Sequence, residues 1–596
     1  MASPQTANRP LDWDLSDLYS HFRDPKFSQD LTAAQEQSLA FRQRYRGQLP
    51  LLSAAEIAAA IAELEAIYER IQRVAAFPSL RFAADTHDRE AKRYDDQAQE
   101  ALADIEQTLV FFRLELQGLE EVPFAELQQA PELDPYRYFL QKLAQQRQHQ
   151  LPEAVEQVLT QAALTGREAF VKLRSLHLGL QSYAAVTLPD GSHAQTESEL
   201  NALLYHLKPK VRLAAYQSVR HVLETHNPLY GYILNTVVQD HRFDSQRRGY
   251  DSTLHKQLTV DEVSMSVFEA LMEGTRDRFD LFQRYYRLKG RRMGRSVRIC
   301  DLYAPWEGSQ PRIPYDEGIQ ILMQALQAFS PEYADLARPF FEQNWIDARI
   351  RPGKRGGAFC SYVPGLHSYL LLSYTDTANA LFTLAHEMGH GLHYERIRAH
   401  QSYVNSDPPM VLAEIASTFN ELLLLDYLLK ENRDPNVARS LLTQQLEDQL
   451  NLLFRQSTIS RLEMVLHQQA RQGSFDHEFI NEEWLKVYQD LCGDAVELLP
   501  EHQFDWARIG HLFFKPFYCY NYSLSFVVSI ACYQRYLQEG KDFVAPYLSL
   551  LDQGGSQPPE IALKSVGIDL TDPGTIAAAL DYTETLIDQL ENTLAE

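Results

Sequence analysis

The stretch Thr383-Leu384-Ala385-His386-Glu387-Met388-Gly389-His390 places two histidines four positions apart, with a glutamate directly after the first. Residues four apart lie on one face of an α-helix, so both imidazoles can reach a single metal ion. Zinc suits such a site, because it accepts tetrahedral coordination and binds imidazole nitrogen readily. The segment therefore predicts a helix that binds one zinc ion per chain through His386 and His390.

Glu387 follows the first predicted ligand. Its carboxylate is expected beside the metal, where it can hold a water molecule and take its proton. A zinc ion lowers the pKa of a bound water to about 7 and polarises a carbonyl group. These are the groups that hydrolysis of an amide bond requires. The motif therefore predicts a hydrolase with Glu387 as the general base.

A catalytic zinc site needs a third protein ligand and one open position. The segment Val411–Glu421 is predicted to be helical, and its acids Glu414 and Glu421 are seven positions apart, on one face. Glu414 lies 24 positions after His390, which is enough for one helix to end and another to pack back. We expect Glu414 to be the third ligand and Glu421 to orient a ligand, although spacing alone does not order the two acids.

A third histidine, His393, lies seven positions after His386 and close to the same helix face. As a ligand it would strain a tetrahedral site, so a hydrogen-bonding role near the metal is the favoured interpretation. The extended pattern H-E-x-x-H-x-x-G-x-x-H is excluded, because His393 and Arg396 occupy its glycine and final histidine positions.

Helical periodicity covers most of the remaining sequence. Ser53-Ala54-Ala55-Glu56 has the form of a capping box and precedes a helical pattern from Ile57 to Ala75. Thr259-Val260-Asp261-Glu262 has the same form and predicts a helix start before Val263. The strand-like segments are Tyr183–Leu188 before a turn at Pro189–Gly191, Val297–Tyr303, Phe359–Val363 and Tyr369–Tyr374. The sequence predicts a mainly α protein with one small β-sheet in the middle of the chain.

The 596-residue chain is 45% apolar and 23% charged, which is typical of a globular protein. Its 56 basic and 80 acidic residues give a net charge of -24 without a long basic cluster, so we expect no nucleic-acid partner. Five cysteines in so long a chain favour a reducing compartment. No segment approaches the roughly 20 apolar residues that span a bilayer. The N-terminus has no apolar signal core, so we expect a cytoplasmic protein without a membrane partner.

Six blocks of the sequence form a further pattern. They are Trp13–Tyr19, Gly353–Ala358, Tyr369–Tyr374, Phe382–His393, Glu414–Glu421 and His511–Tyr522. In content and order they resemble the oligoendopeptidase F family, a branch of the thimet-oligopeptidase-like zinc metallopeptidases. The resemblance implies a two-lobed helical peptidase with a deep substrate channel, a helical N-terminal region over 1–200 and a zinc peptidase region over 201–596. It also implies a metal held by His386, His390 and Glu414.

The same resemblance implies that a C-terminal block of His and Tyr residues lies near the substrate. In this chain the block contains His511, Tyr518, Tyr520 and Tyr522. A tyrosine hydroxyl aimed at the developing oxyanion would supplement zinc. The candidate catalytic residues are His511, Tyr518 and Tyr522, with Tyr520 as a supporting or substrate-binding group. The register between the tyrosines stays open, and a core aromatic contact is the alternative for each.

Tyr369–Tyr374, directly before the predicted zinc helix, is a candidate edge strand that would offer backbone groups to an extended peptide. Gly356 and Gly357 permit a tightly turned loop beside it and are candidate substrate-binding positions. A purely structural hairpin explains these residues equally well.

Together these features predict a zinc-dependent endopeptidase that hydrolyses internal bonds of short oligopeptides. A zinc carboxypeptidase or dipeptidase on the same fold is one alternative. A non-catalytic peptide-binding relative is another, although the intact H-E-x-x-H motif argues against it. The sequence contains no signal for cleavage preference, substrate length limits, physiological substrate or oligomeric state.

Overall fold

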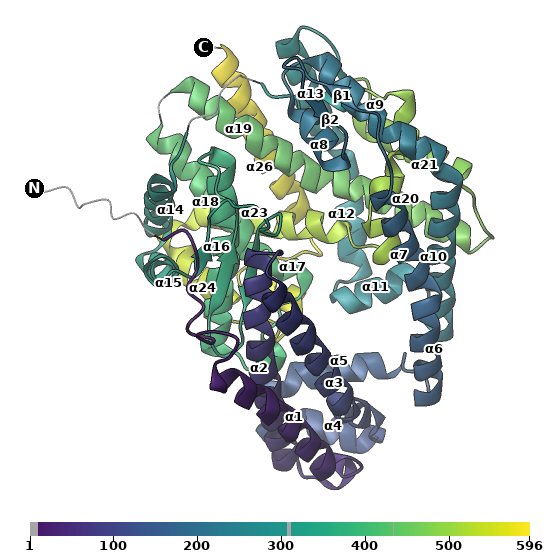
Figure 1. Ribbon diagram of the computed structural model, residues 1–596, viewed down its shortest axis with the longest axis vertical. Helices are drawn as coiled ribbons and strands as arrows, with labels where there is room; N and C mark the ends of the chain where they lie inside the picture. Colours follow the sequence, from purple (N-terminus) through teal and green to yellow (C-terminus); the bar gives the residue numbers. More distant parts are fainter. Residues whose placement is uncertain (1–9, 307–311, 433, 596) are drawn as a thin grey trace, which may run out of the picture. The chain divides into compact units, whose positions relative to one another are not determined.

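The computed structural model describes residues 10–306, 312–432 and 434–595. It is mainly helical, as the sequence predicts (Figure 1). The chain divides into two compact units. The first comprises Met1–Gln148, Pro311–Glu431 and Cys532–Ile568, and the second comprises His149–Gln310, Asn432–Ala531 and Asp569–Glu596. These units have other bounds than the predicted regions 1–200 and 201–596, and that division stays a prediction.

The first unit is built from helices that come from distant parts of the chain. They are α1 (Pro25–Tyr45), α2 (Ala54–Ala84), α3 (Arg89–Gly118), α4 (Glu121–Gln129), α5 (Arg137–Arg147), α14 (Tyr315–Phe329), α15 (Pro331–Glu342), α16 (Ala378–His400), α17 (Met410–Ala413), α18 (Ile415–Glu431), α24 (Val544–Leu551) and α25 (Pro559–Lys564).

The second unit has its own set of helices. They are α6 (Glu153–Thr165), α7 (Arg167–Gly179), α8 (Glu197–Ala202), α9 (Pro209–Thr225), α10 (Asn227–Arg247), α11 (Thr253–Asp261), α12 (Met265–Asp277), α13 (Phe279–Met293), α19 (Pro435–Leu450), α20 (Gln456–Ala470), α21 (His477–Cys492), α22 (His511–Phe514) and α26 (Pro573–Ala595). Helix α23 (Tyr520–Glu539) begins in the second unit and ends in the first.

The two predicted helix starts have different outcomes. Ser53 caps α2 as a complete capping box, in which the Glu56 carboxylate accepts a hydrogen bond from the Ser53 amide at 2.8 Å. The start predicted at Thr259 is wrong, because Thr259 lies inside α11 and its hydroxyl donates to the His255 carbonyl. Helix α12 begins instead after Ser264, whose side chain accepts a hydrogen bond from the Val267 amide.

A small sheet in the first unit has the strand order β4-β6-β5, with β4 (Ile346–Asp347), β5 (Phe359–Tyr362) and β6 (Ser368–Leu371). Strand β6 pairs in parallel with β4 and antiparallel with β5. The prediction of an edge strand at Tyr369–Tyr374 is therefore wrong. Two neighbouring strands already use the hydrogen-bonding groups of β6, and its side chains are completely buried. The sheet packs against α16 through β5 and β6.

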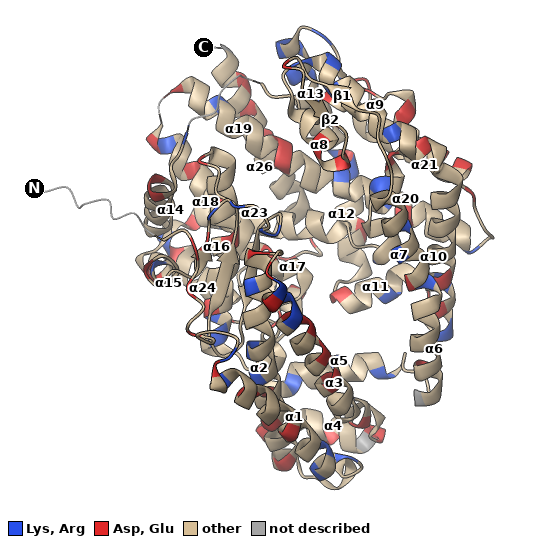
Figure 2. Cartoon of the chain, in the orientation of Figure 1, with Lys and Arg blue, Asp and Glu red and all other residues tan. Residues whose placement is uncertain are grey.

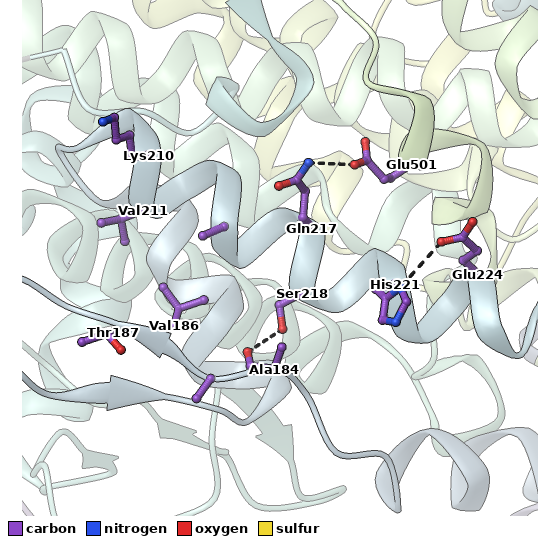
Figure 3. A pocket seen from close by; sticks show the side chains of 12 residues that line it. Ala184, Val186, Thr187, Lys210, Val211, Gln217, Ser218, His221, Glu224 and Glu501 are labelled. Carbon is purple, nitrogen blue, oxygen red and sulfur yellow. Dashed lines mark hydrogen bonds and ion pairs between the residues drawn. The ribbon is translucent and has the colours of Figure 1, made fainter.

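The predicted hairpin after Tyr183 is present in the second unit, where β1 (Val186–Thr187) pairs antiparallel with β2 (His193–Ala194). A separate pair of strands in the same unit is parallel, with β3 (Val297–Arg298) paired to β7 (Val496–Glu497). A pocket of about 630 Å³ lies between the hairpin and α9 (Figure 3). Gln217 donates to Glu501 and His221 faces Glu224 there, so these polar side chains are paired with one another.

Acidic and basic residues are interspersed along the helices of both units (Figure 2). Among the residues that the structure describes, no helix combines the length and the apolar character that crossing a membrane would require.

Candidate metal centre and supporting residues

Helix α16 carries the H-E-x-x-H motif. Its start is capped by Thr377, whose hydroxyl accepts a hydrogen bond from the Ala380 amide at 3.2 Å. The apolar residues Leu384, Met388 and Leu392 are fully buried on the side that packs into the unit. His386 and His390 keep partly exposed side chains, and their rings lie 4.9 Å apart at an angle of 81°.

Three potential ligand atoms converge at this point. The Nε2 atom of His386 lies 3.5 Å from Oε2 of Glu414, and the Nε2 atom of His390 lies 3.4 Å from the same oxygen. One ligand atom from each residue lies within 4.8 Å of the others. In the described part of the chain this is the one group of His, Cys, Asp or Glu side chains arranged in this way. We call it the ligand triad.

The backbone at Glu414 differs from the predicted continuous helix Val411–Glu421. Helix α17 ends at Ala413 and α18 begins at Ile415, so Glu414 occupies a break between them, with φ -93° and ψ 0°. This bridge conformation is sparsely populated and is frequent at functional residues. The Ser417 hydroxyl donates to Oε2 of Glu414 at 2.8 Å. The break and this hydrogen bond direct the carboxylate toward the two histidines.

Helices α16 and α18 pack closely, and Gly389 makes this possible (Figure 1). A Cβ atom on Gly389 would lie 2.5 Å from Cα of Ser417 and would also collide with the Ala416 carbonyl. The Asn420 amide donates to the Ala385 carbonyl at 3.2 Å and accepts from the Tyr333 hydroxyl at 3.1 Å. Direct backbone contact between the helices therefore sets the distance from the histidines to Glu414.

This packing brings the two acids to opposite sides of the His386 ring. Oε1 of Glu421 lies 2.6 Å from Nδ1 of His386, on the side of the ring opposite to Glu414. Burial favours the neutral imidazole, but the hydrogen bond and charge of Glu421, together with Glu414 and Glu387, raise the pKa of His386 to about 9. A carboxylate on Nδ1 fixes the ring orientation and leaves Nε2 free to bind a metal.

Glu387 and His393, the other titratable residues of the motif segment, are buried beside the triad. Glu387 is 7% exposed, and burial raises the pKa of its carboxyl, against the opposing charges of His386 and His390. Burial works against the ionised form of Glu414, but His390, His386 and Ser417 lower its pKa to about 2. His393 is buried outside the ligand triad, and burial, with the charge of His390, lowers its pKa to about 3.

Two imidazole nitrogens and one carboxylate oxygen form a donor set that suits a catalytic zinc ion, which keeps a further position open for water or substrate. The partial exposure of all three side chains leaves room for that position. The residues of this structure therefore fit the zinc ion that the motif implies.

The loop between β4 and β5 contains Gly356 and Gly357, and both are exposed. Gly357 has φ +84°, a left-handed conformation that favours glycine. The loop is anchored by Lys354, whose ammonium lies 2.6 Å from Oδ1 of the buried Asp347 and 2.6 Å from the Leu372 carbonyl. The structure thus places both glycines on a fixed turn at the end of the small sheet.

The C-terminal block lies in the second unit, and its members are not equivalent. The rings of His511 and Tyr518 stack at 5.1 Å and 7°, and the Tyr522 hydroxyl lies 3.4 Å from Nε2 of His511. All three are partly exposed, and we call them the His/Tyr cluster. Tyr520 is fully buried, and its hydroxyl donates to Oδ2 of Asp261 at 3.0 Å. Burial lowers the pKa of His511, and the nearby Arg455 adds to this effect.

Sequence reasoning missed two residues that build the centre, Gly389 and Asn420. A glycine inside a helix costs about 1 kcal/mol relative to alanine, so its presence between the two histidines is a signal of close packing. No comparable signal marks Asn420, because its partners Ala385 and Tyr333 are 35 and 87 positions away in the chain.

Comparison with known proteins places this architecture in a family. The model of Peptidase family M3 matches residues 202–582, and the model of Oligopeptidase F matches residues 115–179. The chain therefore belongs to peptidase family M3. The predicted resemblance to oligoendopeptidase F is confirmed by relatives that match over nearly the whole chain.

Two of these relatives are bacterial peptidases. The oligoendopeptidase F homolog of Lactococcus lactis subsp. lactis is 28% identical over 591 residues, which cover 98% of this chain and 97% of that protein. Oligopeptidase PepF of Bacillus subtilis is 26% identical and covers 98% of this chain. The crystal structure of oligoendopeptidase-F from Enterococcus faecium superimposes with a TM-score of 0.73 at 23% identity, covering 96% of this chain and 99% of that one. This last likeness supports the fold.

Proposed function

We propose that the protein is a zinc-dependent endopeptidase that cleaves internal bonds of short oligopeptides. The observation that supports this best is the convergence of His386, His390 and Glu414, with Glu387 one position from the first ligand. Membership of a peptidase family and relatives named oligoendopeptidase F supply the substrate class.

His386, His390 and Glu414 would hold the metal, and Glu421 would keep the His386 ring in orientation through its Nδ1 contact. A bound zinc ion would supply Lewis-acid chemistry, polarising the scissile carbonyl and acidifying water. The Glu387 carboxylate takes the proton of the attacking water and passes it to the amine nitrogen as the C–N bond breaks. The products are a carboxylate and an amine, as hydrolysis of a peptide bond requires.

We further propose that the His/Tyr cluster donates a hydrogen bond to the oxyanion that forms during the attack. Tyr518 and Tyr522 are the donor candidates, because they are partly exposed, whereas the Tyr520 hydroxyl is committed to a buried carboxylate. Preorganised donors of this kind contribute strongly to hydrolysis, because they stabilise charge that is present only in the transition state.

The Glu387→Gln variant tests the base assignment. We expect it to bind stoichiometric zinc, because the ligand triad is intact, and to lose about 10²–10⁴-fold in kcat, since the amide cannot accept the proton. The measurement is hydrolysis of a quenched-fluorescent peptide, with zinc content determined on the same sample. Turnover of this variant at the wild-type rate would show that another group is the base.

Mass spectrometry of the products of a ten-residue peptide tests the endopeptidase assignment. Internal fragments are expected, whereas stepwise loss of single residues would support the carboxypeptidase or dipeptidase alternative. Tight peptide binding by a protein without stoichiometric zinc or turnover would support the non-catalytic alternative.

A further inference from the structure

A buried acid in the second unit, Glu463 on α20, contacts the backbone of the C-terminal block. Its side chain is 3% exposed, and Oε1 accepts a hydrogen bond from the Phe517 amide at 2.6 Å. Its other oxygen, Oε2, is buried without a hydrogen-bond partner in the described part of the chain. A buried carboxyl with one oxygen lacking a hydrogen-bond partner lowers the stability of the fold. Such a group in a folded protein calls for an explanation, and an apolar residue would avoid the cost.

Phe517, the residue that Glu463 contacts, has a strained backbone. Its φ is +52°, a left-handed value that bulky residues rarely adopt. Its ring is buried and lies 4.8 Å from the ring of His467, which is one turn after Glu463 on α20. Strained conformations of this kind persist only where the surrounding structure imposes them, and they occur preferentially at functional sites. One contact that the surroundings make with this backbone is the hydrogen bond from the Phe517 amide to Glu463.

The strained residue directly precedes Tyr518. The direction in which the chain leaves Phe517 determines where the Tyr518 ring lies, and that ring stacks on His511. Tyr522 completes the cluster, with its ring 5.3 Å from Tyr518 and its hydroxyl near His511. A change at Glu463 would therefore act on the His/Tyr cluster through the Phe517 backbone, without any direct contact to the cluster.

We propose that Glu463 is a positioning residue, whose carboxyl holds Phe517 in its left-handed conformation and thereby orients Tyr518 against His511. The catalytic consequence rests on the proposed function of the His/Tyr cluster. The hydrogen bond from the Phe517 amide needs an acceptor oxygen but no negative charge. Burial raises the pKa of Glu463 to about 8, so its carboxyl is mainly neutral at neutral pH.

The test compares Glu463→Gln, which keeps an acceptor of the same length, with Glu463→Leu, which removes it. We expect Glu463→Leu to lower kcat about 10–100-fold, the range typical of groups that orient a metal ligand, with KM and zinc content unchanged. Glu463→Gln should stay within about threefold of wild type in kcat. Leu466→Ala, a buried position on the same helix, is the matched control for loosened packing, and its kcat should remain near wild type.

The proposal is wrong if Glu463→Leu retains wild-type kcat, if Glu463→Gln is as impaired as Glu463→Leu, or if Leu466→Ala reproduces the loss. If Glu463→Leu does not fold, Glu463→Asp withdraws the acceptor from the Phe517 amide by one methylene and should lower kcat, whereas wild-type kcat in this variant would overturn the proposal.

His511→Ala, measured in parallel, separates this proposal from the proposed function. Loss of kcat in His511→Ala but not in Glu463→Leu rejects the positioning role alone. Wild-type kcat in His511→Ala rejects the catalytic role of the cluster. In that case a crystal structure of Glu463→Leu decides the positioning claim, which requires that Phe517 leaves the left-handed region and that the Tyr518 ring shifts.

Discussion

The ligand triad of the first unit and the His/Tyr cluster of the second unit differ in how their geometry is imposed. In the triad, two ligands come from one helix, and regular α-helical spacing already brings their rings within 4.9 Å. In the cluster, Tyr518 directly follows a strained backbone at Phe517, which a buried acid 54 positions away holds in place. The comparison teaches that helical spacing fixes the two histidines relative to each other, whereas Glu414 and the rings of the His/Tyr cluster depend on contacts with distant segments.

The largest effect on zinc binding and turnover is expected at Gly389, because the position of Glu414 depends on the contact between α16 and α18. Gly389→Ala places a methyl group against Ala416 and Ser417, and overpacking of this kind costs about 1–3 kcal/mol or separates the helices. Separation moves Glu414 from the histidines, so we expect loss of stoichiometric zinc and of nearly all turnover. Zinc analysis and peptide hydrolysis measure both.

The matched control is Gly473→Ala in the second unit, where an added Cβ meets no atom within 4 Å. Full zinc binding by Gly389→Ala would show that the helices can adjust, and that close approach at this residue is not what positions Glu414.

The next largest effect is expected on kcat and distinguishes Tyr522 from Tyr520. Removing one oxyanion donor typically costs about 10²–10³-fold in kcat, and we expect this for Tyr522→Phe if its hydroxyl is the donor. Tyr520→Phe instead leaves the buried Asp261 with one hydrogen bond fewer, which costs about 1–3 kcal/mol of stability with kcat near wild type.

Steady-state kinetics and thermal unfolding of the two variants separate these effects. An unchanged kcat in Tyr522→Phe would move the assignment to Tyr518, for which Tyr518→Phe is the corresponding variant.

A smaller effect, on zinc affinity, is expected at Glu421, the acid that contacts Nδ1 of His386. Glu421→Gln retains the size of the side chain but weakens the contact to Nδ1 of His386. Groups that orient a metal ligand in this way typically contribute about 10–100-fold in metal affinity or activity. Zinc titration against a competing chelator measures the change. Glu431→Gln at the exposed end of the same helix is the control, and equal affinities in both variants would show that Glu421 does not support the site.

The last effect concerns not activity but the pH dependence of stability, at Glu463. The pKa of this carboxyl is about 8 in the folded protein, against 4.5 for an ordinary glutamate. Between these values the unfolded chain has lost the proton that the folded chain keeps, so stability falls as the pH rises through this window. Glu463→Gln lacks this titration. Its Tm relative to wild type should therefore increase from pH 5.5 to 8 and then level off.

Leu466→Ala serves as the control for this measurement, because it keeps Glu463 and therefore titrates as the wild type does, and its Tm difference from wild type should stay constant over the same range. A constant difference for Glu463→Gln would show that the carboxyl is ionised in the folded protein throughout.

Much of the fold was predictable from local signals. Helical periodicity and the capping box at Ser53 are set by neighbours in the chain, and the structure confirms the mainly α architecture and the hairpin after Tyr183. Predictions failed where a local pattern competed with its surroundings. Thr259 has the form of a cap but is already inside α11, and β6 is strand-like but acquires a second partner, β4, that no nearby residue indicates.

For the candidate site, the motif residues His386, Glu387 and His390 are recognisable because helical geometry alone relates them. The positions of Glu414 and Glu421 relative to the histidines depend on the packing of α18 on α16 and on the backbone break at Glu414, since both acids have the same periodicity. The separation of Tyr520 from Tyr518 and Tyr522 likewise depended on Asp261 and Glu463, which lie far away in the chain. The spacing of residues along the chain determines which side chains share a helix face. Which of these side chains meet is decided only by tertiary packing, because it depends on contacts between segments whose distance along the chain follows no rule.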